Sequence, residues 1–170
     1  MKHKSVLFSG LMILFCVSVC FTQSGYLKIG DIKGESTDRR HKEWIEILSI
    51  SQGLEQQQLA TGATRRRGSV VLKDLIITKK LDKATPKLME LCAKGQVVPE
   101  LVLDIVTNGK VNYKITLGNA RISSINTSSI CDPDCELKDD VSISYSQITW
   151  EFWDNKGKKV VATYNAKTGI

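Results

Sequence analysis

From residue 26 onward the chain alternates hydrophobic and polar residues over short stretches, the pattern of strands with one buried face. Seven stretches show this alternation or a run rich in isoleucine, leucine and valine: residues 26–32, 43–51, 68–78, 98–107, 111–126, 141–153 and 158–165. Many short strands joined by turns are typical of antiparallel sandwiches and barrels. We therefore predict a mainly β fold, an antiparallel β-barrel or sandwich of about seven or more strands.

Two turns have the composition of hairpin connections. Asn108 and Gly109 stand between strand patterns and suit a two-residue turn that needs positive φ at both central positions. Residues 154–157 read Asp-Asn-Lys-Gly and connect the last two predicted strands. Both connections favour strands that are antiparallel neighbours.

One stretch, residues 81–96, predicts a helix instead. Thr85 can cap its start, Pro86 fits its first turn, and Gly95 fits just past its end. Three side chains share one face at helical spacing and are expected to pack on the sheet: Leu88, Leu91 and Cys92. The domain is thus predicted to carry one α-helix on its side, with Cys92 as a small buried apolar residue.

The N-terminus carries an uncharged apolar run, residues 6–21, behind Lys2 and Lys4. This arrangement indicates a signal peptide over residues 1–24, with cleavage between about residues 20 and 25. An uncleaved anchor and a lipoprotein acylated at Cys20 are the alternatives, although the run is short for a membrane span of about 20 residues. Residues 25–170 then form one domain, secreted or periplasmic, with no stable membrane insertion; assembly is cytoplasmic if the leader is not used.

Composition and charge limit the kinds of partner that the protein can bind. The chain has 170 residues, of which 42% are hydrophobic and 25% charged, as in ordinary globular proteins. Its formal charge of +6 falls by two when the leader is removed. The remaining basic residues are interleaved with acidic ones, so we predict no nucleic-acid partner.

Five cysteines are present, and two of them, Cys16 and Cys20, belong to the leader region. Cys131 and Cys135 flank a proline-containing turn, so a disulfide-closed loop is geometrically possible and an exported protein permits it. Two free thiols are the alternative. A metal site needs further ligands that the sequence does not supply, so no metal is predicted.

The sequence contains no recognisable set of catalytic residues. His41 is the one imidazole outside the leader, and Glu35 and Asp38 lie near it in the sequence. All lie in a polar connection with interleaved basic residues, so we favour a solvated or locally hydrogen-bonded histidine over an acid–base or metal site. No phosphate-binding loop, serine-hydrolase elbow or spaced zinc pattern occurs. We predict a protein that is not an enzyme and binds no cofactor.

Near the C-terminus, residues 145–153 gather four aromatic side chains. Trp150 and Phe152 share one face of a strand, where core packing accounts for them, whereas Trp153 lies on the other face and suits an interface or an edge-covering role.

The ordered segments at 26–51, 70–96, 113–126 and 141–158 resemble the haemolysin-coregulated protein (Hcp) family, the tube protein of the bacterial type VI secretion system. The carrying motifs are the first strand with its Gly-Glu-Ser connection and following histidine, and the strand that leads into the Pro-Lys-Leu helix. The likeness spans about residues 26–165.

The resemblance implies a β-barrel-like domain that assembles into a hexameric ring. Such rings stack into a hollow tube, which implies contacts with sheath, spike and effector proteins, and the ring can carry small cargo. The leader and the Cys131–Cys135 segment depart from the family pattern. An exported binding or adhesin-like module, outside an active secretion tube, is the alternative function.

Residues 53–69 form the longest stretch without periodicity, and they include Arg65, Arg66 and Arg67. A solvated loop is the simplest interpretation. A long polar loop on a small barrel costs ordering entropy, however, so we predict that it reaches a neighbouring subunit, with the three arginines as contact candidates.

Overall fold

The structure of the protein is a computed structural model that describes residues 23–56, 70–131 and 135–169. The described chain is mainly β with one helix, α1 (Thr85–Lys94), which confirms the predicted fold class. The strands are β1 (Gln23–Ile29), β2 (Ile45–Ile47), β3 (Ser49–Ser51), β4 (Leu54–Gln56), β5 (Val70–Leu72), β6 (Leu75–Lys80), β7 (Val97–Thr107), β8 (Lys110–Cys131), β9 (Cys135–Ser144), β10 (Gln147–Trp153) and β11 (Lys159–Asn165). Within these ranges, no helix is long and apolar enough to cross a membrane.

One antiparallel sheet organises the domain, in the order β2-β1-β7-β8-β9-β6-β3. Its two end strands are consecutive in the chain and are separated only by Leu48, whose N–H donates to the carbonyl of Thr78 at 2.7 Å. Residues 45–51, predicted as one strand, therefore bend and pair with β1 at one end and β6 at the other. This bend joins the two ends of the sheet into a barrel.

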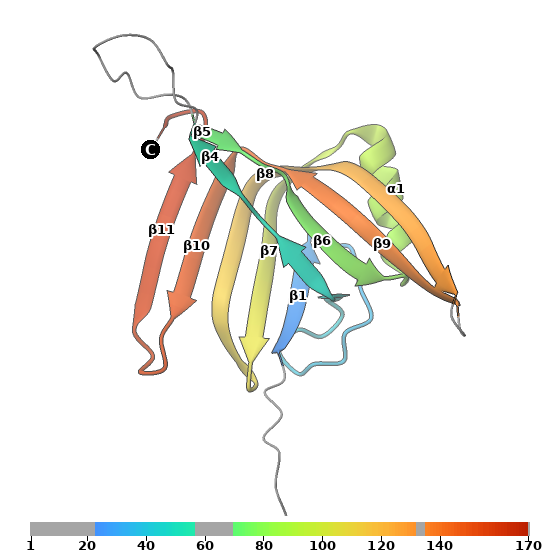
Figure 1. Ribbon diagram of the computed structural model, residues 1–170, viewed down its shortest axis with the longest axis horizontal. Helices are drawn as coiled ribbons and strands as arrows, with labels where there is room; N and C mark the ends of the chain where they lie inside the picture. Colours follow the sequence, from blue (N-terminus) through green and yellow to red (C-terminus); the bar gives the residue numbers. More distant parts are fainter. Residues whose placement is uncertain (1–22, 57–69, 132–134, 170) are drawn as a thin grey trace, which may run out of the picture.

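Strand β8 is long because it belongs to two parts of the molecule. Its first part pairs with β10 and its second part with β9, so β9 and β10 follow one another along the same side of β8. The change of partner coincides with Asn119, which has a φ of +51°. The predicted strand 141–153 is consequently divided at Tyr145 and Ser146. We call β10 and β11, together with residues 110–118 of β8, the flap (Figure 1).

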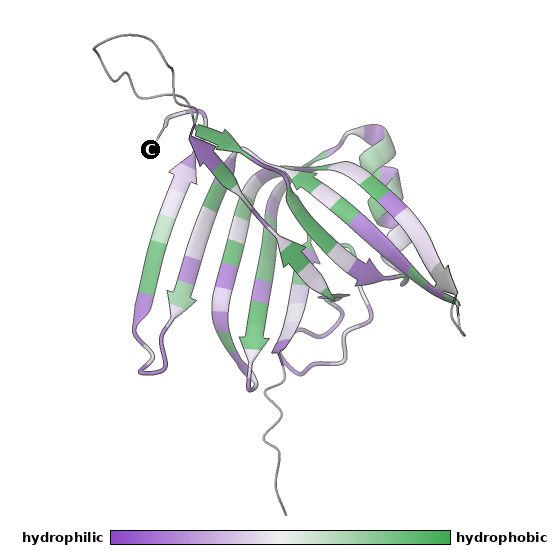
Figure 2. Ribbon diagram, viewed as in Figure 1, coloured by the Kyte–Doolittle hydropathy of each residue, from purple (hydrophilic) through white to green (hydrophobic). Residues whose placement is uncertain are grey.

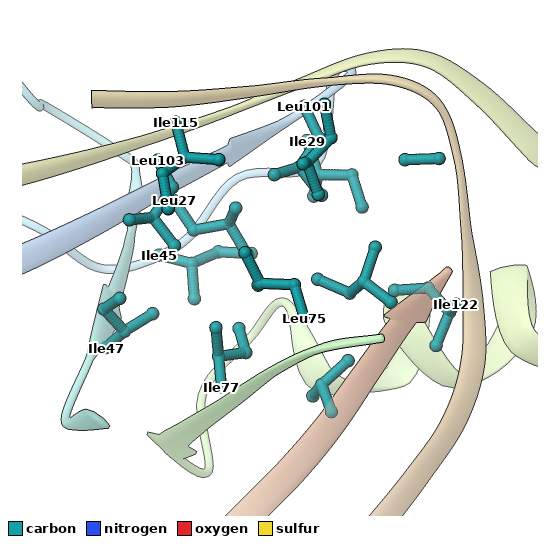
Figure 3. Packing of buried hydrophobic residues seen from close by; sticks show 14 of the residues in the cluster. Leu27, Ile29, Ile45, Ile47, Leu75, Ile77, Leu101, Leu103, Ile115 and Ile122 are labelled. Carbon is teal, nitrogen blue, oxygen red and sulfur yellow. The ribbon is translucent and has the colours of Figure 1, made fainter. Parts of the chain in front are cut away.

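The barrel interior is filled by aliphatic side chains from facing strands, as Figure 3 shows for ten labelled residues. Alternation along each strand points one set inward: Leu27 and Ile29 from β1, for example, against Leu75 and Ile77 from β6. All four are at most 1% exposed. The hydrophobic pattern of the sequence thus fixes which face of each strand is buried.

The predicted turn at Asn108 and Gly109 is confirmed. Their φ values are +51° and +71°, and Thr107 pairs with Lys110 across the turn. The second turn, between β10 and β11, is closed by Asp154, whose carboxylate accepts from the N–H groups of Lys156 and Lys158 at 2.8 Å each. Both connections therefore join antiparallel neighbours, as expected.

Helix α1 has the predicted ends except at its cap. Thr85 does not cap the helix, since it is the first helical residue and its hydroxyl donates to Asp139 of the sheet. The N-cap residue is Ala84, whose methyl side chain accepts no hydrogen bond. Pro86 lies in the first turn and Gly95 ends the helix at φ +58°, as predicted. Leu88 is buried, and Leu91 and Cys92 are partly buried against the core, also as predicted. On the exposed side, hydrogen bonds from Lys94 and Lys87 lower the pKa of Glu90 to about 2.

A buried polar network attaches α1 to the sheet. Lys79 on β6 is fully buried, and its ammonium group lies 2.7 Å from the carboxylate of Asp82 and 3.0 Å from that of Asp139 on β9. Thr85 accepts from Lys79 at 2.9 Å and donates to Asp139. Burial raises the pKa of Asp139, but hydrogen bonds from Thr85, Thr127 and Lys79 outweigh it and hold that pKa below its ordinary value.

The stretch 53–69, predicted as a loop, is partly strand. Leu54–Gln56 pairs with Val70–Leu72 as the separate two-stranded sheet β4–β5, and residues 57–69 lie outside the described residues. Because β4 follows β3 and β5 precedes β6, this ribbon continues the β3–β6 pair away from the barrel (Figure 1). We call residues 52–56 and 70–74 the arm. Polar composition concealed the strand, since two of its three β4 residues are Glu55 and Gln56.

Candidate self-assembly surface

The flap extends the apolar face of the sheet beyond the barrel. Ile115 on β8 is in register with Trp150 on β10, which is in register with Ala162 on β11. The next row is Tyr113, Phe152 and Val160, on the same face. Trp150 packs against the core as predicted, but Phe152 is 47% exposed, which makes the predicted core role wrong for it. The core covers this face at Ile148 and in part at Tyr164, but leaves Phe152 and Val160 exposed.

Strand β11 is an open edge. Among the described residues it pairs only with β10, so one side of its backbone has no strand partner. Val160 and Val161 are 57% and 52% exposed, and as consecutive strand residues they lie on opposite faces. Figure 2 shows a hydrophobic stretch, in green, on this strand. Edge strands are normally short, bulged or charged, because a free apolar edge pairs with other chains. An edge of seven residues with a central Val-Val-Ala run is suited to contact another chain.

The opposite face of the flap carries charged groups beside Val161 and Trp153. Lys159 lies 2.6 Å from the carboxylate of Glu151 and 5.1 Å from the ring centre of Trp153. Trp153 therefore covers the edge hairpin together with a lysine, in line with the edge-covering role predicted for it. The two faces of the flap differ in polarity, so a partner at the edge meets an apolar face on one side and charged groups on the other.

The arm is the second projecting feature. Leu54 on β4 is 49% exposed and Val71 on β5 is 37% exposed, and the ribbon is crossed by a Lys73–Glu55 ion pair at 3.0 Å. An isolated two-stranded ribbon is marginal in water. The arm therefore presents apolar side chains and free strand edges that a neighbouring molecule can cover.

The predicted alternative, a chemical site at His41, is excluded by its geometry. Nδ1 lies 2.8 Å from a carboxylate oxygen of Asp38, and Nε2 lies 3.1 Å from one of Asp104 on β7. The ring stacks on Tyr26 at 4.4 Å and is edge-on to Trp44. The side chain is locally hydrogen-bonded, as one alternative had it, but it is buried and not solvated. Neither ring nitrogen is left to exchange a proton with a substrate.

Charged side chains from more than one strand surround His41. The hydrogen bond from His41 is the main reason that the pKa of Asp38 lies below its ordinary value, with the N–H of Arg40 contributing. The second oxygen of Asp104 has no hydrogen-bond partner and faces Lys114 of β8 at 3.5 Å. Through these two contacts His41 holds the connection between β1 and β2 on the barrel.

The other predicted site residues have different outcomes. Arg65, Arg66 and Arg67 lie outside the described residues, so their contact role stays a prediction. Cys135 is disulfide-bonded, and Cys131 is its register partner at the end of the β8–β9 hairpin. No group of three or more candidate metal ligands occurs in the described ranges.

The sequence interpretation missed the flap edge itself. Residues 158–165 were predicted as a strand, but alternation does not distinguish an edge strand from a central one. The available signal was the run Val160, Val161 and Ala162, which puts apolar residues on both faces of one strand. In a sheet that is not covered on both sides, such a run indicates a contact surface.

The chain is similar in sequence and in structure to known proteins of one family. The family described as "Type VI secretion system effector, Hcp" matches residues 26–152. Protein hcp1 of Pseudomonas aeruginosa is 35% identical over 136 residues, which cover 77% of this chain and 83% of that protein.

Solved structures show the same fold. The structure described as that of a type six secretion system protein is 26% identical with a TM-score of 0.79, covering 88% of this chain and 99% of that one. Hcp1 from Salmonella typhimurium is 27% identical with a TM-score of 0.75, over 86% and 97% of the two chains. On the match over residues 26–152 and the likeness to Protein hcp1, the chain belongs to the Hcp family of the type VI secretion system.

Proposed function

We propose that copies of this chain assemble into a six-membered ring through the flap of one copy and the arm of the next, and that rings stack into a secretion tube. The observation that carries the proposal is the open β11 edge, with its exposed Val160 and Val161. Flap and arm are different surfaces, so their contact is heterologous, and a heterologous contact closes into a ring when its rotation repeats. Membership in a family of ring-forming tube components supports the same assembly.

The first test measures the mass of the assembly. Residues 23–170 are expected to run at about six times the monomer mass in light scattering, at micromolar concentration. Val161→Lys places a charge on the open edge, so it is expected to move the population to the monomer while the far-UV circular dichroism spectrum stays that of the wild type.

Val97→Lys is the matched control, because Val97 is a similarly exposed strand valine, on β7 at 45%. It is expected to keep the hexamer. A wild-type protein that stays monomeric at these concentrations contradicts the proposed ring.

We also propose the partners that a tube requires. Sheath and spike proteins contact the outside and the end of such a tube, and an effector enters its lumen. We propose no catalytic role for the chain, because the one described imidazole is held between two carboxylates.

The leader gives the proposal a further part. Export with removal of the leader is supported by the apolar run and by the disulfide at Cys135, since disulfides persist in oxidising compartments. We propose Cys131 as the partner of Cys135. Gln23 and Ser24 already pair with β7, so cleavage at or before residue 22 leaves β1 intact.

Intact-mass measurement of the protein from cell fractions and medium tests both points. The expected mass is that of a chain that begins near residue 23 and is about 2 Da lower than the mass of the same chain in reduced form. Digestion is expected to release a peptide pair linked by Cys131 and Cys135. A full-length reduced protein found only in the cytosol contradicts export. A processed monomer confined to the periplasm favours instead the exported binding module.

A further inference from the structure

The arm joins the barrel through a short joint where regular pairing stops. The last pair of the β3–β6 ladder is Ser51 with Ile76, and the first pair of the β4–β5 ladder is Leu54 with Leu72. Between them lie Gln52 and Gly53 on one strand, and Lys73, Asp74 and Leu75 on the other, of which Leu75 already pairs with β9. One backbone hydrogen bond spans the joint, from the N–H of Lys73 to the carbonyl of Gly53 at 3.1 Å. With so little pairing, the backbone alone does not fix the direction of the arm.

One strand of the joint is tied to the flap by a side chain. The amide nitrogen of Gln52 donates to the hydroxyl of Tyr145 at 3.4 Å, and its amide oxygen accepts from the indole N–H of Trp150 at 3.3 Å. Tyr145 lies in the connection from β9 to β10, and Trp150 lies in the middle of β10. Both rings are partly buried against the core, so they form a fixed platform. Two bonds to separate groups define the position of Gln52 better than one bond does.

The other strand of the joint is tied to the barrel. The carboxylate of Asp74 accepts a hydrogen bond from the hydroxyl of Ser123 at 2.5 Å. Ser123 is the extra residue of β8 at the irregularity in its pairing with β9. A bulge re-aims the side chain that it carries, and here it presents a hydroxyl to the joint. Ser123 therefore has a positioning role that regular pairing does not give it.

We propose that Gln52 and Asp74 are positioning residues for self-assembly, which fix the angle between arm and flap by holding the two strands of the joint. The inference rests on the proposed ring, because ring closure requires the same angle at each of its contacts. Neither residue needs to touch the neighbouring subunit. Without the two ties the arm can swing about the joint, and contacts that form then fail to close into one defined ring.

The experiment compares variants that remove each tie without adding bulk or charge. Gln52→Leu removes both amide bonds, and Ser123→Ala removes the donor to Asp74. Their matched controls are Gln96→Leu, an exposed glutamine beyond α1, and Thr78→Val, which breaks a similar hydroxyl–carboxylate bond to Asp140 within the barrel. The double variant Gln52→Leu/Ser123→Ala tests whether the ties act together.

Two readouts separate positioning from a general loss of stability. Hydrogen exchange is expected to quicken about five- to tenfold in peptides that carry β4 and β5, with little change in β1 and β7, since each tie is an ordinary hydrogen bond. Light scattering is expected to show fewer closed hexamers and more open or smaller species, with an unchanged far-UV circular dichroism spectrum. Both controls are expected to behave as the wild type.

The outcomes distinguish this inference from the proposed ring. If the wild type never forms hexamers, the ring is wrong, while exchange in the arm still decides on the ties. If arm exchange in both variants equals that of the wild type, the positioning role is overturned. Faster arm exchange with an unaltered hexamer distribution overturns it as well, because the ties then have no consequence for assembly.

Discussion

Replacing Lys79 with methionine is expected to lower the free energy of unfolding by about 3–5 kcal/mol. The methionine side chain fills a similar volume, but it leaves the carboxylates of Asp82 and Asp139 without their shared cation. Asp139 is fully buried and has no access to solvent to compensate. The first turn of α1 loses its attachment at the same time, because Thr85 belongs to the same network. Urea unfolding followed by circular dichroism measures the change.

Lys80 provides the control for this substitution. It is the next residue of the same strand and pairs with Glu136 at 2.5 Å, but its side chain is 64% exposed. Lys80→Met is expected to change the free energy of unfolding far less than Lys79→Met, because exposed ion pairs contribute little to stability. If both variants lose the same free energy of unfolding, the buried network is not what stabilises the attachment of the helix.

The second large effect is expected at His41. His41→Ala removes the anchor of the connection between β1 and β2 and leaves the buried carboxylate of Asp104 with only Lys114, at 3.5 Å. The expected loss is again about 3–5 kcal/mol, since a buried ring is truncated and a buried carboxylate loses its hydrogen-bond partner. Tyr26 also loses the ring stacked on it. The same unfolding measurement detects the change.

The neighbouring Arg40→Ala serves as the comparison, because Arg40 is exposed and contributes only its backbone N–H to Asp38. Its effect is expected to stay within about 0.5 kcal/mol. A His41→Ala protein as stable as Arg40→Ala, but impaired in secretion, argues for a role of His41 at a surface instead of inside the barrel.

Most of the fold can be predicted from the sequence, because the alternation of hydrophobic and polar residues, the turn residues and the helix ends are local signals. Asn108 and Gly109 require a turn with positive φ, and Gly95 ends α1 at +58°. The misplaced helix cap has a tertiary cause. Threonine is a common N-cap residue, but the hydroxyl of Thr85 binds Lys79 and Asp139 instead. These two residues lie on strands of the sheet, so the local sequence around Thr85 does not reveal the contact.

The assembly surface is harder to predict, because it depends on which strands become neighbours. The pattern at 158–165 predicts a strand, whereas only the sheet order shows that β11 is an edge. Gln52 and Asp74 lie in unremarkable polar positions, and their partners Tyr145, Trp150 and Ser123 are distant in sequence. Pairs of this kind follow from the fold and not from spacing.

Strand β8 has a mechanical consequence. Its 22 residues run without interruption from the flap into the β8–β9 hairpin. A pull on the flap along this strand is therefore carried into the barrel by covalent backbone, while the hydrogen bonds to β7 and β9 are loaded in shear along the ladder. Bonds loaded in this way must break together and not one after another. A force that reaches β8 from the edge strand therefore enters the barrel along this strand.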